Sequence, residues 1–171
     1  LRLERRSGQG AGDRAGAGDR DRRPRFGPGA GGLIDTVAGS LLVFGGGYVG
    51  QRAAAEALRR GMTASATSRD AGRRAGFEAA GVTGVDPADD AALQGAVARA
   101  SAILVTAPPE ATGCPGLKTL IPAITASAAY PDWIGYVSST AVYGDRDGGW
   151  AFEDDALNAS SLEGARRVRA E

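Results

Sequence analysis

Three glycines with a fixed spacing are the first residues of this chain whose pattern indicates chemistry. Gly45, Gly47 and Gly50 form a G-x-G-x-x-G motif, which follows the apolar run 41–44 and precedes a helix-forming segment at 51–60. In that position the first glycine allows a tight turn, the second lets the backbone approach a pyrophosphate, and the third allows close helix–strand packing. The phosphates would lie on the unpaired N–H groups of the helix N-terminus. A simple glycine-rich turn is the alternative. The residues assigned to the dinucleotide site are Gly45, Gly47, Tyr48, Val49 and Gly50.

The end of the second expected strand indicates which dinucleotide the site favours. A chain that binds NAD places an acidic residue there, about 20 residues after the glycines, to bind the ribose 2′-hydroxyl. Here the segment 66–69 reads Ala-Thr-Ser-Arg. Ser68 and Arg69 suit a 2′-phosphate, because a guanidinium makes charge-assisted hydrogen bonds to phosphate. We therefore predict NADP as the cofactor, with NAD less favoured. The alternative is that Arg69 is a solvated residue before a helix.

Asp86 ends the third expected strand and is a further candidate for the nucleotide site. Its carboxylate would accept a hydrogen bond from an adenine amino group. Equally, Asp86 would serve as a turn residue before Pro87.

Apolar runs and helix-forming segments alternate from residue 39 onward. Strands are expected at 41–44, 62–67, 82–86, 102–106 and 133–138, and helices at 51–60, 70–80, 91–100 and 117–129. This alternation predicts an α/β fold, a Rossmann-type doubly wound parallel sheet with helices on both faces. Such sheets bind ligands beyond the carboxyl ends of their strands. Because the chain stops inside a helical pattern at 161–171, we expect the fold to be incomplete at the C-terminus.

Single residues refine these expectations. Asp89 or Asp90 would cap the third helix. Pro122 would lie in the first turns of the fourth helix or kink it. Trp133 and Tyr136 on the last strand are expected in the core.

Composition excludes several classes of function. The chain has 171 residues, a net charge of zero and no histidine, which argues against a general nucleic-acid binder and excludes a Ser-His-Asp triad. With one cysteine, Cys114, it can form no disulfide within the chain and no cysteine-cluster zinc site, so we predict no metal and a reducing, cytoplasmic location. No apolar segment approaches the ~20 residues of a membrane span. Residues 1–38 are interpreted as a disordered or mis-started leader, with a basic binding arm as the alternative, and 39–171 as the nucleotide-binding domain.

Several motifs together resemble a known superfamily. They are the glycine motif, Ala-Thr-Ser-Arg at 66–69, Ser-Ser-Thr-Ala-Val-Tyr-Gly-Asp at 138–145 and the final Arg-x-x-x-Glu at 167–171. From about residue 41 onward the chain resembles the short-chain dehydrogenase/reductases. The branch is the extended, atypical one of NAD(P)-dependent epimerase/dehydratase-like proteins, and 133–150 looks like a bacterial subgroup. The resemblance implies a substrate-binding part beyond residue 171, so the chain looks C-terminally truncated.

The resemblance also implies site residues. Ser139 takes the position of the Ser/Thr that polarises the reacting oxygen. Tyr143 takes a position where the extended branch usually has a wall residue, and it is a candidate for the proton step, as is the acidic run 153–155, only because the superfamily's own tyrosine position is not filled. The superfamily's tyrosine and lysine, four residues apart, fall on Glu163 and Arg167, and neither position matches. An arginine keeps the positive charge, but its pKa is too high for proton exchange. At the end of the fourth strand the superfamily's backbone passes along the cofactor, so Thr106 and Pro108 are assigned to the cofactor site.

These features favour an NADP-binding oxidoreductase or epimerase that acts on a small hydroxyl or keto substrate. A non-catalytic dinucleotide-binding sensor or regulatory module is the rival interpretation, since both residues of the Tyr-x-x-x-Lys pair are missing. A truncated, inactive fragment is the third. We expect a small molecule as the partner and expect neither nucleic acid nor a membrane. A homodimer is possible from the sequence.

Overall fold

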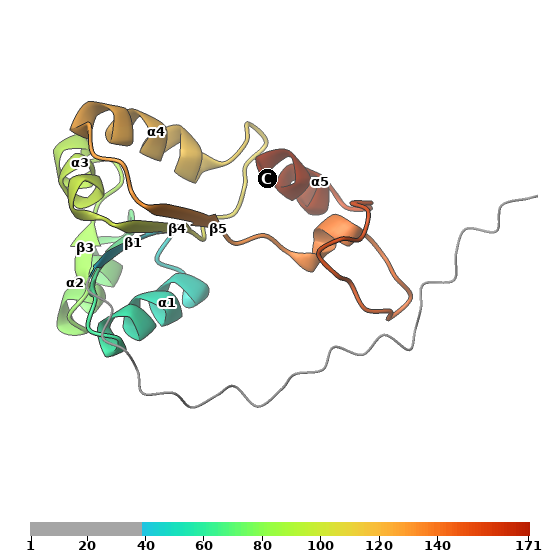
Figure 1. Ribbon diagram of the computed structural model, residues 1–171, viewed down its shortest axis with the longest axis horizontal. Coiled ribbons are helices and arrows are strands. Elements are labelled where there is room, and N and C mark those ends of the chain that lie inside the picture. The colour runs from blue at the N-terminus through green and yellow to red at the C-terminus, as the bar shows by residue number, and fades with distance from the viewer. Residues whose placement is uncertain (1–38) are drawn as a thin grey trace, which may run out of the picture.

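Five parallel strands form the sheet at the centre of the molecule (Figure 1). The computed structural model describes residues 39–171, so the interpretation of 1–38 as a leader lies outside the described residues. The strand order is β3-β2-β1-β4-β5. The strands are β1 Ser40–Phe44, β2 Thr63–Thr67, β3 Thr83–Val85, β4 Ala102–Val105 and β5 Trp133–Tyr136. The chain winds outward from β1 first to β3 and then to β5, which confirms the doubly wound α/β fold.

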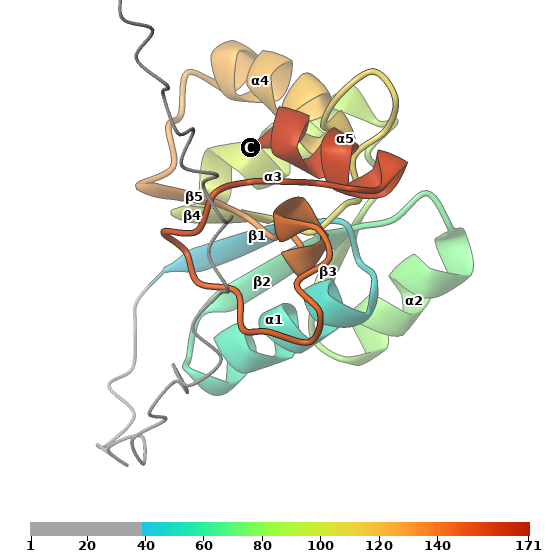
Figure 2. The same cartoon turned by 90° about the vertical axis from the view of Figure 1, so that its right-hand side faces the viewer.

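Helices cover both faces of this sheet (Figure 1). Helices α1 and α2 pack on one face, and α3 and α4 on the other. Helix α5 and the short 3-10 helix η1 lie beyond the carboxyl end of β5, where Figure 2 shows them in front of the sheet. The helices are α1 Tyr48–Arg59, α2 Ala71–Ala79, α3 Asp90–Arg99, α4 Pro115–Ser127, η1 Thr140–Tyr143 and α5 Leu162–Ala170. Within the described part of the chain, no helix is long and apolar enough to cross a membrane.

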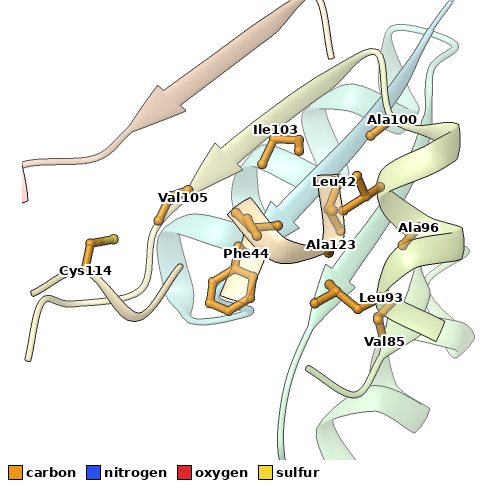
Figure 3. Packing of buried hydrophobic residues seen from close by; sticks show 12 residues of the cluster. Leu42, Phe44, Val85, Leu93, Ala96, Ala100, Ile103, Val105, Cys114 and Ala123 are labelled. Atoms are coloured by element: carbon orange, nitrogen blue, oxygen red, sulfur yellow. The ribbon is translucent and has the colours of Figure 1, made fainter. Parts of the chain in front are cut away.

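The apolar core follows from the alternation of side chains along the buried strands. Leu42 and Phe44 on β1 point toward α3 and α4, and Figure 3 shows them packed with Leu93 and Ile103. Val43 points to the opposite face and packs against α1 and α2. Complete burial of a side chain of this size contributes about 1.5–3 kcal/mol. The two layers of side chains therefore hold β1 and β4 rigidly, and with them the turns that follow these strands.

The strands and helices predicted from local sequence signals agree with those of the structure, with a few differences. The side chain of Asp89 caps α3 by accepting a hydrogen bond from the N–H of Ala92 at 3.0 Å, which decides between the two candidate caps. Helix α4 begins earlier than expected, at Pro115, so Pro122 lies in its interior rather than in its first turns. The 3-10 helix η1 was not expected.

Trp133 is the clearest departure from the expected core. The prediction that it is buried was wrong, since 53% of the residue is exposed. It lies on β5, the edge strand, on the same side of the sheet as α1. Helix α1 packs over β1 and β2, and the Trp133 ring instead lies over Gly135, where a Cβ would collide with it. Because β5 is the edge strand and α1 does not extend over it, no helix covers the Trp133 side chain on this face.

Candidate functional site

A pocket of about 510 Å³ opens at the carboxyl ends of the strands. Its walls come from the glycine turn after β1, the end of β2, the turn after β3 and the β4–α4 loop. It therefore lies where a doubly wound sheet binds its ligands. The sequence-predicted residues that line it are Gly45, Gly47, Ser68, Arg69, Thr106 and Pro108.

The three glycines of the motif have different physical requirements. Gly45 has a φ of +111°, and a Cβ there would lie 2.7 Å from the backbone nitrogen of Ala107. At Gly50 a Cβ would collide with the carbonyl oxygen of Gly45. A Cβ built at Gly47, by contrast, would meet no described atom within 4 Å. Gly45 and Gly50 are thus needed to close the turn, whereas Gly47 faces open space that a ligand can fill.

Two threonines from the neighbouring strands hold the glycine turn in place. The N–H of Gly45 donates to Oγ1 of Thr67 at 2.9 Å, and Oγ1 of Thr106 donates to the carbonyl oxygen of Gly45. The N–H of Gly46 also donates to the carbonyl oxygen of Thr67, at 2.8 Å. Thr106, assigned to the cofactor from the sequence, is therefore engaged with the turn itself. Thr67 was missed, because nothing local distinguishes it from any other threonine that ends a strand.

The N-terminus of α1 presents free backbone donors behind this turn. Helices α2, α3 and α5 are capped by the side chains of Asp70, Asp89 and Ser161, whereas α1 and α4 have no side-chain cap. Gly47 has no side chain with which to cap α1, and the first turn of α1 contains no acidic residue. The first hydrogen bond of α1 runs from the N–H of Gln51 to Gly47 at 2.9 Å.

The three N–H groups before Gln51 in α1 make no hydrogen bond within residues 39–171. A helix N-terminus with unpaired donors and its positive dipole end favours an anion. Tyr48, Val49 and Gly50 would thus contribute backbone groups, while the Tyr48 side chain is 76% exposed and points elsewhere.

Two arginines reach the same pocket from the β2–α2 junction. Arg69 and Arg73 both line it and are both exposed. Neither guanidinium has an ion pair or hydrogen bond to another part of the described chain. Asp70 caps α2 between them, by accepting from the N–H of Arg73 at 2.6 Å. Sequence reasoning missed Arg73, although its spacing of four residues from Arg69 at a helix start was an available signal. Glu110, from the β4–α4 loop, is the acidic residue among those that line the pocket.

Asp86 is held at the neighbouring turn rather than in the pocket. Its carboxylate pairs with Nη1 of Arg74 at 3.0 Å and accepts from the N–H of Ala88 at 3.0 Å. The same Nη1 donates to the carbonyl oxygen of Ser68 at 2.7 Å. Asp86 is not among the described residues that line the pocket. Through Arg74 it ties the end of β3 to the end of β2, which is the geometry expected of the turn residue.

The catalytic candidates lie beyond β5. Ser139 is the N-cap of η1, where its Oγ accepts from the N–H of Ala141 at 3.2 Å. Tyr143 ends the same 3-10 helix and is half-buried. Neither belongs to the described residues that line the pocket, so the structure does not place them at its wall.

Helix α5 carries Glu163 and Arg167, the residues at the mismatched positions. The Arg167 side chain is largely buried and donates from Nη1 to the carbonyl oxygen of Val137 at 3.1 Å. Its Nη2 lies 3.6 Å from Oε1 of Glu163. Ser138 makes a hydrogen bond to the carboxylate of Glu171. One face of α5 thus fastens the segment that carries Ser139.

Tyr136 meets this helix from the sheet. Its hydroxyl and Nε of Arg167 are both buried without a hydrogen-bond partner among the described residues. Burial raises the pKa of the Tyr136 phenol, and the nearby guanidinium of Arg167 opposes that shift in part. Tyr136 is therefore a neutral phenol at physiological pH and not a ready source of phenolate.

The strand order and the glycine turn define a Rossmann-type α/β fold. No family model and no curated protein matches the chain. A solved structure of a functionally unknown conserved protein from Silicibacter pomeroyi DSS is 32% identical over 77% of the chain, with a TM-score of 0.67. A short-chain dehydrogenase/reductase superfamily protein from Agrobacterium tumefaciens, determined with bound NAD, is 21% identical over 77% of the chain, with a TM-score of 0.53. The chain spans 46% and 42% of the length of these two proteins.

Proposed function

We propose that residues 39–171 bind NADP(H), as the nucleotide-binding part of an atypical short-chain dehydrogenase/reductase-like oxidoreductase or epimerase. One observation carries this proposal. The uncapped start of α1 and two unpaired guanidinium groups, those of Arg69 and Arg73, lie at the same strand-end pocket. A dinucleotide with a third phosphate presents anions at both places.

The residues present fit this cofactor group by group. The open space at Gly47, next to the free N–H groups of α1, suits the pyrophosphate. Arg69 and Arg73 suit the 2′-phosphate, since guanidinium groups bind phosphate with charge-assisted hydrogen bonds. Ser68 lies beside them, with its Oγ accepting from the N–H of Asp70 at 3.2 Å. The carboxylate that follows the β2 end, that of Asp70, already accepts from the N–H of Arg73 as the cap of α2, which supports NADP over NAD.

The bound cofactor would supply hydride transfer to or from a carbon that carries a hydroxyl or keto group. The chain's own residues would position that group. Ser139 would donate a hydrogen bond to the reacting oxygen, and Tyr143 would supply or take the proton. Pro108 and Thr106 would limit the pocket on the β4 side.

A non-catalytic dinucleotide-binding module is the second candidate function. The specific observation in its favour is that Arg167 is turned to Val137 and Glu163, and not toward the pocket. Without a free cation near a tyrosine, the ordinary proton transfer of the superfamily has no equivalent. Reduction of a panel of small ketones and aldehydes by NADPH, with Ser139→Ala as the control, separates the two functions.

Fluorescence titration of the full chain with NADPH and NADH tests the binding proposal. We expect NADPH to bind at least about tenfold more tightly than NADH, because each charged hydrogen bond contributes about 1.5–3 kcal/mol. Arg69→Ala and Arg73→Ala should each lower the affinity for NADPH and leave the affinity for NADH nearly unchanged. Arg99→Ala, an exposed arginine on the opposite face, is the matched control. Equal affinities for the two cofactors would contradict the NADP assignment. A folded protein that binds neither cofactor would contradict the whole proposal.

A further inference from the structure

We propose that a second pocket, the α1–α2 groove, binds an amphiphilic anion: a carboxylate on an apolar chain. The groove has a volume of about 450 Å³ and lies between helices α1 and α2, outside the nucleotide pocket. Its volume is within the range of small-molecule sites, which are mostly apolar with a few convergent polar groups. The lining residues that define its chemistry are Arg52, Arg73, Gly76, Phe77 and Val82.

The floor of the groove is apolar. Phe77 and Val82 belong to the core layer under α1 and α2, together with Ala54 and Ala66. The small alanine side chains leave the groove hollow, and Gly76 opens it further, because a Cβ there would meet no described atom within 4 Å. Apolar surface of this kind favours a ligand that removes it from water. An alkyl chain or an apolar ring is the chemistry that fits.

The rim of the groove is positively charged. Arg52 and Arg73 line it, and none of its described lining residues is acidic. The nearest acidic side chain along α1, Glu56, is already bonded to Arg59 and Arg60. The polar groups at the rim therefore leave two positive charges without a counter-ion from the described chain.

Neither rim guanidinium is satisfied by an acid. The Arg52 guanidinium lies 5.4 Å from the centroid of the exposed Tyr48 ring. Gln51 uses one amide N–H within the protein, since its Nε2 donates to the carbonyl oxygen of Gly46. Charge complementarity thus selects an anionic head group, which Arg52 and Arg73 would bind at the mouth of the groove.

Arg73 also lines the nucleotide pocket, so it connects the two sites. A carboxylate bound at Arg73 would compete with a 2′-phosphate for the same guanidinium. This coupling, unlike the groove itself, rests on the proposed function. Because of this coupling, the amphiphile would lower the affinity for NADPH. The affinity for NADH, which has no 2′-phosphate, would stay unchanged.

Calorimetric titration of the cofactor-free full chain with decanoate tests the groove, with decanol as the uncharged analogue. We expect saturable decanoate binding at one site and at least tenfold weaker binding of decanol. Gly76→Leu fills the groove and should weaken decanoate at least tenfold, while the helix is kept because leucine favours it over glycine. Ala75→Leu, the neighbouring exposed position of α2 outside the groove, is the matched control and should bind as the original chain does. Arg52→Ala should weaken decanoate and leave decanol unchanged.

Two results would overturn the inference. One is the absence of decanoate binding by protein whose circular dichroism shows it to be folded. The other is decanoate binding by Gly76→Leu with the affinity of Ala75→Leu. Because the titration contains no cofactor, failure of NADPH to bind would contradict the proposed function and leave this result standing.

Discussion

The guanidinium of Arg167 donates a hydrogen bond to the backbone carbonyl oxygen of Val137 at 3.1 Å. Arg167 stands where the resemblance to the dehydrogenase/reductases implies a lysine that holds the ribose. Here that cation is directed at Val137, the residue after β5, and Glu171, the C-cap of the same helix, bonds to Ser138. Helix α5 therefore supports the segment that carries Ser139, and the positive charge of Arg167 interacts with the protein itself.

Replacement of Arg167 by methionine tests this role. We expect Arg167→Met to lower the free energy of unfolding by about 1–3 kcal/mol, because the partly buried carbonyl of Val137 loses its charged donor. Hydrogen exchange of the amides in 138–142 should become faster, while NADPH affinity should stay within about twofold of the original, in keeping with a cation that makes no cofactor contact. Arg169→Met, on the exposed side of α5, is the matched control. A large loss of NADPH affinity with unchanged exchange would place the cation on the cofactor instead.

The glycines of the turn should separate binding from folding. Gly47→Ala should leave the free energy of unfolding within about 1 kcal/mol, because its backbone is extended at φ −75° and its Cβ would stand in open space. It should weaken NADPH at least about tenfold, since the new methyl group occupies room that a pyrophosphate needs. Gly50→Ala should instead cost about 1–3 kcal/mol of stability, because its Cβ would collide with Gly45. Chemical denaturation and NADPH titration of both variants measure the two effects. Equal losses of stability and of NADPH affinity in the two variants would contradict these separate roles of Gly47 and Gly50.

Glu56 gives a pH-dependent prediction. Hydrogen bonds from Arg59, and then from Arg60, lower the pKa of the Glu56 carboxyl from 4.5 to about 2. A folded-state pKa below the unfolded one stabilises the protein above pH 4.5, and this contribution is lost as the pH falls from 4.5 toward 2. The stability difference between the original chain and Glu56→Gln should therefore be present at neutral pH and vanish at the acid end of that window.

Urea denaturation between pH 7 and pH 2 measures this difference. Because the three side chains are exposed, salt should reduce it at neutral pH. Glu78→Gln is the matched control, since Glu78 is an exposed helix acid whose carboxylate accepts from a backbone N–H at Gly84 and pairs with no arginine in the described structure. A difference that persists at the lowest pH would show that Glu56 acts through packing and not through its charge.

Contiguous residues were sufficient to predict the five strands and the α-helices, though not η1, and the edge of the sheet at which the pocket lies. Apolar runs such as 41–44 and helix signals such as Asp70 act within a few residues, so the chain itself specifies the alternation of strands and helices. That alternation permits few topologies, and the doubly wound order follows. The glycine motif and Arg69 then fall at strand ends, where the pocket lies.

Only the tertiary structure decided how the side chains at the site are used. The bonds of Thr67 and Thr106 to Gly45 join residues 22 and 61 positions apart, and exist because β2 and β4 flank β1. The same long-range packing brings Arg73 into the pocket and directs Arg167 to Val137, 30 positions away. Such partners depend on strand order and on the placement of α5, which no local propensity encodes.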